Sequence, residues 1–356
     1  MTKQKLSWVL PYFMMSWLLV FLCTRSDVLA FETDQLTYRD RDLNDVGPLV
    51  NERLNEWLEV ARVNTENTLK VKWSDERIAA VMRSHVLGQH SVGKAMSGTP
   101  LELWMKNELL AEYGIYPAFF DQGKKVVSIY SEYRTMVEGW GSIFRIFVFD
   151  ILSKWIGQIV APTFEVNGHR FGTDKLTHFF RLGSRLYDQS YEGTRPDLAA
   201  RYGTYSENNF IGKKTDGVFS FADAAANFSG FEFYRDLVQI NQRDTARSPM
   251  FRITRNHATY PWVRIEKLRP FQISDYISDD WDEYYNPSSY SVALQGAIDK
   301  HLMKYHDRYC DEFSRWSQIR DLDQRRLRSK ADYIDVTQSP EQSDPFEMKR
   351  RCSSSF

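Results

Sequence analysis

The chain has 356 residues, with 46 Lys and Arg against 47 Asp and Glu, so its formal net charge is −1. Aromatic residues make up 15% of the sequence, which excludes a disordered chain. The balanced charge argues against a nucleic-acid-binding protein, because such proteins carry a strongly basic surface. A mean hydropathy of −0.49 excludes a protein built from many membrane-spanning helices. We therefore expect a globular protein with no nucleic-acid partner.

Residues 1–30 have the pattern of an export signal. Two lysines are followed by an uncharged stretch from Leu6 to Cys23, and the small residues Val28 and Ala30 suit cleavage after Ala30. The alternative is an uncleaved N-terminal anchor, because these 18 uncharged residues are just long enough to span a bilayer. Both interpretations place the rest of the chain outside the cytoplasm, in the periplasm or an equivalent extracytoplasmic compartment.

Two cysteines, Cys310 and Cys352, follow the export signal. In an oxidising compartment they either pair in a disulfide that closes a loop of about 40 residues or remain two separate thiols. No pair of cysteines in the chain has the spacing of a zinc finger.

Apolar spacing along the body of the chain predicts mainly helices. Helices are expected at 46–63, from 75 onward, and at 101–113, 173–189, 196–211, 220–239 and 291–333, with a short strand at 124–130. Alternating residues around Asn167-Gly168 predict a β-hairpin at Phe164–Phe171, because this dipeptide favours a tight hairpin turn. Ile143–Val160 is predicted to be a buried core helix, with a helix lying on a membrane surface as the alternative.

The ends of these elements are marked by turn and capping residues. Thr99 and Thr173 are each expected to cap a helix. The segment from Arg252 to Tyr290 is rich in Pro, Asp and aromatic residues and is expected to form long ordered loops, and 337–356 is expected to be a flexible tail. The expected fold is therefore mainly α, with a single multi-helix domain over 31–336 that contains a small β-hairpin and long ordered loops.

The helix expected at 173–189 begins with a polar stripe. Asp174 and His178 are four positions apart, which places them on the same helix face, and Lys175 borders that face. Asp174 also lies in the first turn, where the helix dipole favours a carboxylate. Asp174 could therefore be only an acid at the helix start that pairs with His178, which is the alternative to a functional site.

A second stripe is expected on the helix at 220–239. Asp223 and Asn227 are again four apart, Ser220 before them is the expected N-cap, and Gly230 follows on nearly the same side. Many of the other residues of this helix are alanines, whose side chains are small, so the helix can approach another helix closely. Asp and Asn are poor helix formers, so two of them on one face of a helix need a reason. Either they bond polar groups on a neighbouring helix or they face water. Glu207, on the helix between the two stripes, is a further candidate.

The order and spacing of these residues resemble a pattern found in VanZ-like proteins and YfiM-type bacterial envelope proteins. The pattern is Asp-Lys-x-x-His-Phe, then Glu, then Ser-x-x-Asp-x-x-Ala-Asn-x-x-Gly. In this chain it covers about 168–234 and consists of Asp174, Lys175, His178, Glu207, Ser220, Asp223, Asn227 and Gly230. The resemblance implies a bacterial cell-envelope protein with a polar helical core, and it implies no reaction. VanZ-like proteins are small membrane bundles, whereas the equivalent helices here are too polar to span a membrane because they contain Arg181, Arg185, Asp188 and Glu232.

One hypothesis for the stripes is a hydrolase or transferase site. His178, oriented by Asp174, would act as a general base or metal ligand, and Lys175 would hold an anionic group. Glu207, Ser220, Asp223 and Asn227 would complete the site. Asp174, His178 and Asp223 suit a divalent metal ion, because carboxylate and imidazole groups are its usual ligands. No hydrolase or phosphate-loop motif accompanies these residues.

The other hypothesis is a buried hydrogen-bonded network that holds helices together, since buried polar groups must be paired. The protein would then bind another cell-envelope component or a membrane surface. His169, beside the hairpin turn, joins the candidate residues because we expect it to point toward the start of the helix that carries Asp174.

Overall fold

The structure of the chain is a computed structural model. It describes residues 42–90, 99–114, 161–209, 212–213, 218–240, 247–259, 261–292, 306–319, 329–335 and 348–353, and single residues between 295 and 303. Of the described residues, 59% are helical and 13% are in strands, so the mainly α expectation is confirmed. None of the described helices is both long and apolar enough to cross a membrane. The export signal at 1–30, the strand at 124–130 and the helix at Ile143–Val160 lie outside the described residues.

The described chain begins with a helical pair. Helix α2 (Gly47–Thr68) packs against α3 (Asp75–His90), and apolar residues spaced three to four positions apart bury one side of each helix. Leu54 and Leu58 of α2 and Ile78 of α3 belong to this buried face.

A second helical segment follows the expected cap at Thr99. The Thr99 hydroxyl accepts a hydrogen bond from the Glu102 amide at 3.3 Å, so it caps the helix end as its sequence indicated. The segment consists of α4 (Pro100–Trp104), the π-helical η1 (Met105–Leu109) and α5 (Leu110–Tyr113).

A β-hairpin precedes the helix that carries the first polar stripe. Strands β1 (Thr163–Val166) and β2 (His169–Gly172) pair antiparallel around Asn167 and Gly168. Both turn residues have positive φ, 50° and 80°, as a two-residue hairpin turn requires.

The helix after the hairpin is irregular in its middle. It consists of α8 (Asp174–Thr177), the π-helical η2 (His178–Leu182) and α9 (Gly183–Gln189). The expected cap at Thr173 is wrong, because its backbone is already helical (φ −63°, ψ −19°) and its side chain makes no capping hydrogen bond. The π-helical turn begins at His178, and such turns are frequent at functional sites.

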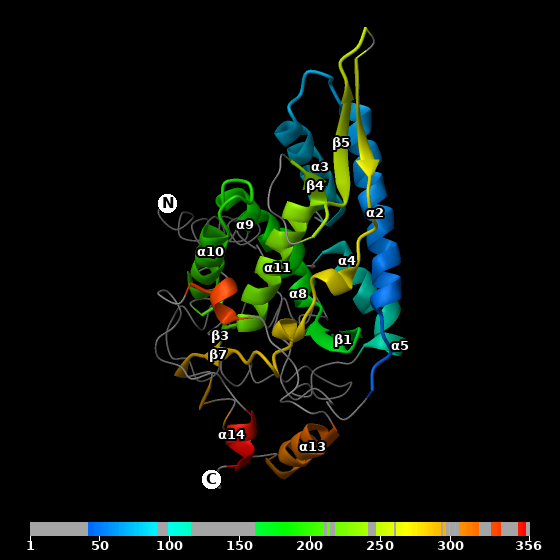
Figure 1. Cartoon of the computed structure of the whole chain (residues 1–356). Coiled ribbons are helices and arrows are strands. Elements are labelled where there is room, and N and C mark those ends of the chain that lie inside the picture. The colour runs from blue at the N-terminus through cyan, green and yellow to red at the C-terminus, as the bar shows by residue number, and fades with distance from the viewer. Residues whose placement is uncertain are drawn as a thin grey trace, which may run out of the picture.

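Helix α11 (Phe221–Leu237) lies at the centre of the fold (Figure 1). It is buried along nearly its whole length and packs against α8, η2, α9 and α10 (Pro196–Asn209). Two glycines permit this contact. A Cβ at Gly230 would overlap the carbonyl oxygen of Phe179 in η2, and a Cβ at Gly183 would lie 2.5 Å from the Cα of Gly230. The backbones therefore touch beside the two polar stripes.

The expectation of loops from Arg252 to Tyr290 is wrong for the first part of that segment. Strands β5 (Phe251–Asn256) and β6 (Trp262–Lys267) pair antiparallel, and β4 (Val238–Gln239) pairs parallel with β5. The hairpin lies beside α2 (Figure 1), where the Ile265 amide donates to Glu66 at 2.9 Å. Ile253 and Ile265 are partners in the register, and the apolar and polar residues around them alternate, as in Val263-Arg264-Ile265-Glu266, which is a strand signal that the expectation of loops overlooked.

The rest of that segment is loop with short ordered turns. It contains the 3₁₀ turns η3 (Ile273–Asp275) and η4 (Asp279–Trp281), and β7 (Ser289–Tyr290) pairs with β3 (Val218–Phe219) just before α11. Trp281 is fully buried, and its Nε1 donates to Ser229 Oγ of α11 at 3.2 Å. These contacts hold the loop around 283 against α11 and the strand before it.

A buried carboxylate lies near the end of α11. Asp236 accepts a hydrogen bond from the Tyr276 hydroxyl at 3.1 Å and lies 3.5 Å from Arg247. Burial raises the pKa of Asp236 to about 6, and the positive charge of Arg247 opposes part of that rise.

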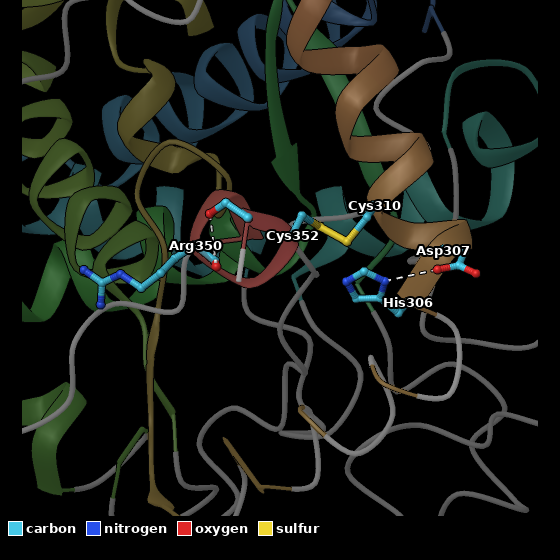
Figure 2. Close-up of a disulfide and its surroundings, with 6 residues drawn as sticks. His306, Asp307, Cys310, Arg350 and Cys352 are labelled. Carbon is cyan, nitrogen blue, oxygen red and sulfur yellow. Dashed lines mark hydrogen bonds and ion pairs between the residues drawn. A yellow bond between two sulfur atoms is a disulfide. The ribbon is translucent and has the colours of Figure 1, made fainter. Parts of the chain in front are cut away.

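The C-terminal region differs from its expectation. Within the helix expected at 291–333, α13 (His306–Ile319) is helical, and so are the described residues 292, 295, 296, 299 and 303. The helix does not extend to Tyr333, because η6 (Lys330–Asp332) is a 3₁₀ turn. Within the segment expected to be a flexible tail, α14 (Met348–Ser353) is joined to α13 by a disulfide. Figure 2 shows Cys310 facing Cys352, with their Cα atoms 5.4 Å apart.

Candidate functional site

Polar side chains from four segments meet beside the N-terminal end of α11. They come from α8 and η2, from α10, from α11 with its cap, and from the loop between η4 and β7, and each is at most 3% exposed. The residues are Asp174, Lys175, His178, Glu207, Ser220, Asp223, Asn227 and Glu283.

Lys175 is the centre of one half of the site. Its ammonium nitrogen lies 2.8 Å from Asp174 Oδ2, 2.7 Å from Asp223 Oδ1 and 2.9 Å from Glu283 Oε1. A buried ammonium group is tolerated only when it is paired and hydrogen-bonded. The three carboxylates therefore offset the cost of burying Lys175, and the lysine in turn joins three parts of the chain.

Glu283 is the residue of this half that sequence reasoning missed. Its oxygens accept hydrogen bonds from Ser220 Oγ at 3.0 Å and from Ser288 Oγ at 2.6 Å. Ser220 also accepts from the Asp223 amide at 3.0 Å, so it caps α11 as expected and holds Glu283 as well. The acidic and aromatic run at 279–285 has no periodicity that would single out Glu283.

His178 is the centre of the other half. Its Nδ1 lies 3.0 Å from Asn227 Oδ1, and its Nε2 lies 3.2 Å from Asp223 Oδ2. Asn227 donates from Nδ2 to Glu207 Oε1 at 3.1 Å, and the same Glu207 oxygen lies 3.6 Å from His178 Nδ1. The structure thus brings both predicted stripes and Glu207 together, and Asp223 links the two halves.

The direction of these hydrogen bonds determines where a proton must lie. Asn227 turns its amide NH₂ toward Glu207, so its carbonyl oxygen faces His178 Nδ1, which must then carry a proton. In a neutral imidazole the other nitrogen, Nε2, is an acceptor, and here it faces the carboxylate of Asp223. Two acceptors at this distance attract one another only when a positive charge, either a proton or a bound cation, lies between them.

Burial governs the ionisation of the site. Burial lowers the pKa of His178, and the carboxylate of Asp223 opposes that change. Burial also raises the pKa of Asp174 to about 7; Lys175 partly offsets this rise, and Asp223 and Glu283 add to it. Among the described residues, Asp174 Oδ1 is buried without a hydrogen-bond partner. Asp174 therefore titrates near neutral pH.

Two further side chains have partners that the sequence did not indicate. His169 pairs with Asp279 of η4, with 2.8 Å between His169 Nδ1 and Asp279 Oδ1, and its side chain is 31% exposed. It therefore faces η4, whereas the sequence predicts that it points toward the start of α8. Thr177 of α8 donates to the buried Glu102 of α4 at 2.8 Å, which fixes another side of the same helix.

Three residues of the cluster have the types and spacing of metal ligands. One ligand atom from each of His178, Glu207 and Asp223 lies within 4.8 Å of the others. His178 and Asp223 were expected in such a set. Asp174, the third expected ligand, is outside it and bonds Lys175 instead, and Glu207 takes its place.

The chain was compared with protein-family models, with curated proteins and with solved structures, and no match was found. The resemblance to VanZ-like and YfiM-type proteins therefore stays a prediction.

Proposed function

We propose that this chain is an exported bacterial cell-envelope protein, in which a buried polar network holds a single helical domain in the shape that binds another envelope component. The observation that carries the structural role is the burial of the site: its polar side chains are at most 3% exposed and connect four segments of the chain. The export pattern at 1–30 and the resemblance over 168–234 support the location.

The same burial weighs against a hydrolase or transferase site. A general base must come within hydrogen-bonding reach of its substrate. Both ring nitrogens of His178 already contact protein groups, Asn227 and Asp223. Lys175, the candidate anion holder, lies within 2.9 Å of three carboxylates that a substrate anion would have to displace. A network that stabilises packing needs no such opening.

The structural role is tested by separating stability from cellular function. In His178→Ala and Asp223→Ala, each buried partner left without its hydrogen bond should cost about 1–3 kcal/mol of unfolding free energy. Cellular function should fall only as far as the amount of folded protein falls. His257→Ala is the matched control, because His257 is exposed on the turn between β5 and β6 and its removal should change neither quantity. Lost function in variants of near-normal stability would instead support a catalytic role.

The location is tested separately. N-terminal sequencing of the protein recovered from cell fractions should find an extracytoplasmic chain, beginning at residue 31 if the export signal is cleaved. A cytosolic protein that begins at Met1 would contradict the proposal.

A further inference from the structure

We propose that His178, Glu207 and Asp223 bind one divalent cation of the Zn²⁺ class inside the protein. The inference deepens the structural role proposed above and rests on the same packing, because the three residues come from η2, α10 and α11. A bound ion would join these three helical elements directly.

The donor set selects the class of ion. One imidazole nitrogen with two carboxylates suits Zn²⁺ and similar first-row divalent ions. Mg²⁺ and Ca²⁺ prefer sites made of oxygen alone. Cu⁺ prefers the sulfur of cysteine or methionine, and the three side chains contain none.

The distances are close to those of a metal site. Ligand bonds of about 2.0–2.2 Å in a tetrahedral arrangement place neighbouring ligand atoms roughly 3.2–3.6 Å apart. His178 Nε2 and Asp223 Oδ2 are already 3.2 Å apart. One ligand atom from each of the three residues lies within 4.8 Å of the others. Glu207 Oε1 lies 3.6 Å from the other ring nitrogen, Nδ1, so the Glu207 side chain would turn toward Nε2 to complete the site.

Each of the three side chains is held by a second polar group, as metal ligands usually are. In the neutral imidazole, the Nδ1–H of His178 points to Asn227 Oδ1 and Nε2 keeps its lone pair. Asp223 uses one oxygen for Lys175 and turns the other toward Nε2. Asn227 also donates to Glu207. This arrangement sets two acceptors against one another, and a cation between them would turn that unfavourable contact into two ligand bonds.

Burial indicates the kind of site. Three protein ligands leave the fourth position of a tetrahedral ion for a water molecule or a further protein oxygen, but the three side chains are at most 3% exposed, so that position is closed to substrate. The ion would therefore stabilise the fold rather than carry out a reaction.

Zn²⁺ itself is the probe for the test. The purified full chain is freed of metal with a chelator and titrated with ZnCl₂ in a calorimeter, and we expect one saturable site per chain and a higher melting temperature with the ion. Co²⁺ in place of Zn²⁺ should give visible absorption bands that report nitrogen and oxygen ligands, which is a readout on the unaltered protein.

Glu207→Gln is the decisive variant, because its amide keeps the shape of the side chain and an oxygen for Asn227 while the negative charge is lost. We expect it to fold and to bind Zn²⁺ at least about 10-fold more weakly. His169→Ala is the matched control, since it removes a histidine–carboxylate pair outside the site. Absence of saturable binding, or Zn²⁺ binding that is unchanged in Glu207→Gln, would overturn the inference.

The two proposals fail in different ways. If Zn²⁺ does not bind but His178→Ala destabilises the protein, the network stands, closed by a proton, and the metal site falls. If Zn²⁺ binds and His178→Ala leaves the stability of the metal-free protein unchanged, the metal site stands and the structural network falls.

Discussion

Replacing Lys175 by Met removes the ammonium group that three carboxylates share, while a side chain of similar length remains. Lys175 is fully buried and lies 2.7–2.9 Å from its three partners. Removing one partner of a buried ion pair costs about 3–5 kcal/mol, because the charge that remains is buried without compensation. Since a typical domain is stable by about 5–15 kcal/mol, Lys175→Met should lose a large share of its stability at pH 7.

Urea unfolding followed by circular dichroism measures the loss. Protonation of the remaining carboxylates should recover part of it, so the deficit of Lys175→Met should be smaller at pH 5 than at pH 7. Adding Asp174→Asn, which removes one of the uncompensated charges, should likewise recover part of the loss at pH 7.

Arg195→Met is the matched control for this variant. Arg195 forms an ion pair with Asp197, and both side chains are more than half exposed, so its loss should change stability little. A loss below about 1 kcal/mol in Lys175→Met, or an equal loss in both variants, would refute the argument that the buried lysine organises the site.

Other parts of the structure predict further outcomes. Gly230→Ala should lose about 1–3 kcal/mol because its Cβ has no room against η2, whereas Gly88→Ala, where a Cβ meets nothing within 4 Å, should be neutral or slightly more stable; equal unfolding curves would contradict this. Folding raises the pKa of Asp236 from 3.8 to about 6, so its protonated form favours the folded state, and this contribution, complete below about pH 4, should be lost as pH rises to about 6. The loss is about 3 kcal/mol, and Asp236→Asn should flatten that part of the stability profile. The Cys310–Cys352 disulfide closes a loop with a sequence separation of 42, which corresponds to about 4 kcal/mol of chain entropy. Reduction should therefore accelerate proteolysis of α14, and equal cleavage rates with and without reductant would contradict the link.

Much of the local structure could be predicted from the sequence, because it depends on residues close in the chain. Apolar periodicity located α2, α3, α10 and α11, and the dipeptide Asn167-Gly168 marked the turn between β1 and β2. Capping chemistry is equally local, as Thr99 and Ser220 demonstrate. The two polar stripes were visible because residues four positions apart on a helix must share a face.

Contacts between distant segments could not be predicted in this way. Glu283 lies in a loop without periodicity, and it reaches Lys175 because Trp281 and β7 hold that loop against α11. His169 lies beside the hairpin turn, and the sequence predicts that it points toward the start of α8, but its direction is set by η4, which lies more than 100 residues away.

Helix geometry depends on near neighbours alone, so the sequence was sufficient to predict which helices carry the polar residues and on which face those residues lie. That the two faces meet could be learned only from the fold, since this depends on the contact of α11 with η2 at Gly230. The same packing decided that Glu207 rather than Asp174 stands with His178 and Asp223 as a candidate metal ligand. Burial also sets the ionisation of these groups, because the loss of water raises the pKa of Asp174 and lowers that of His178. This burial depends on every segment that covers the site.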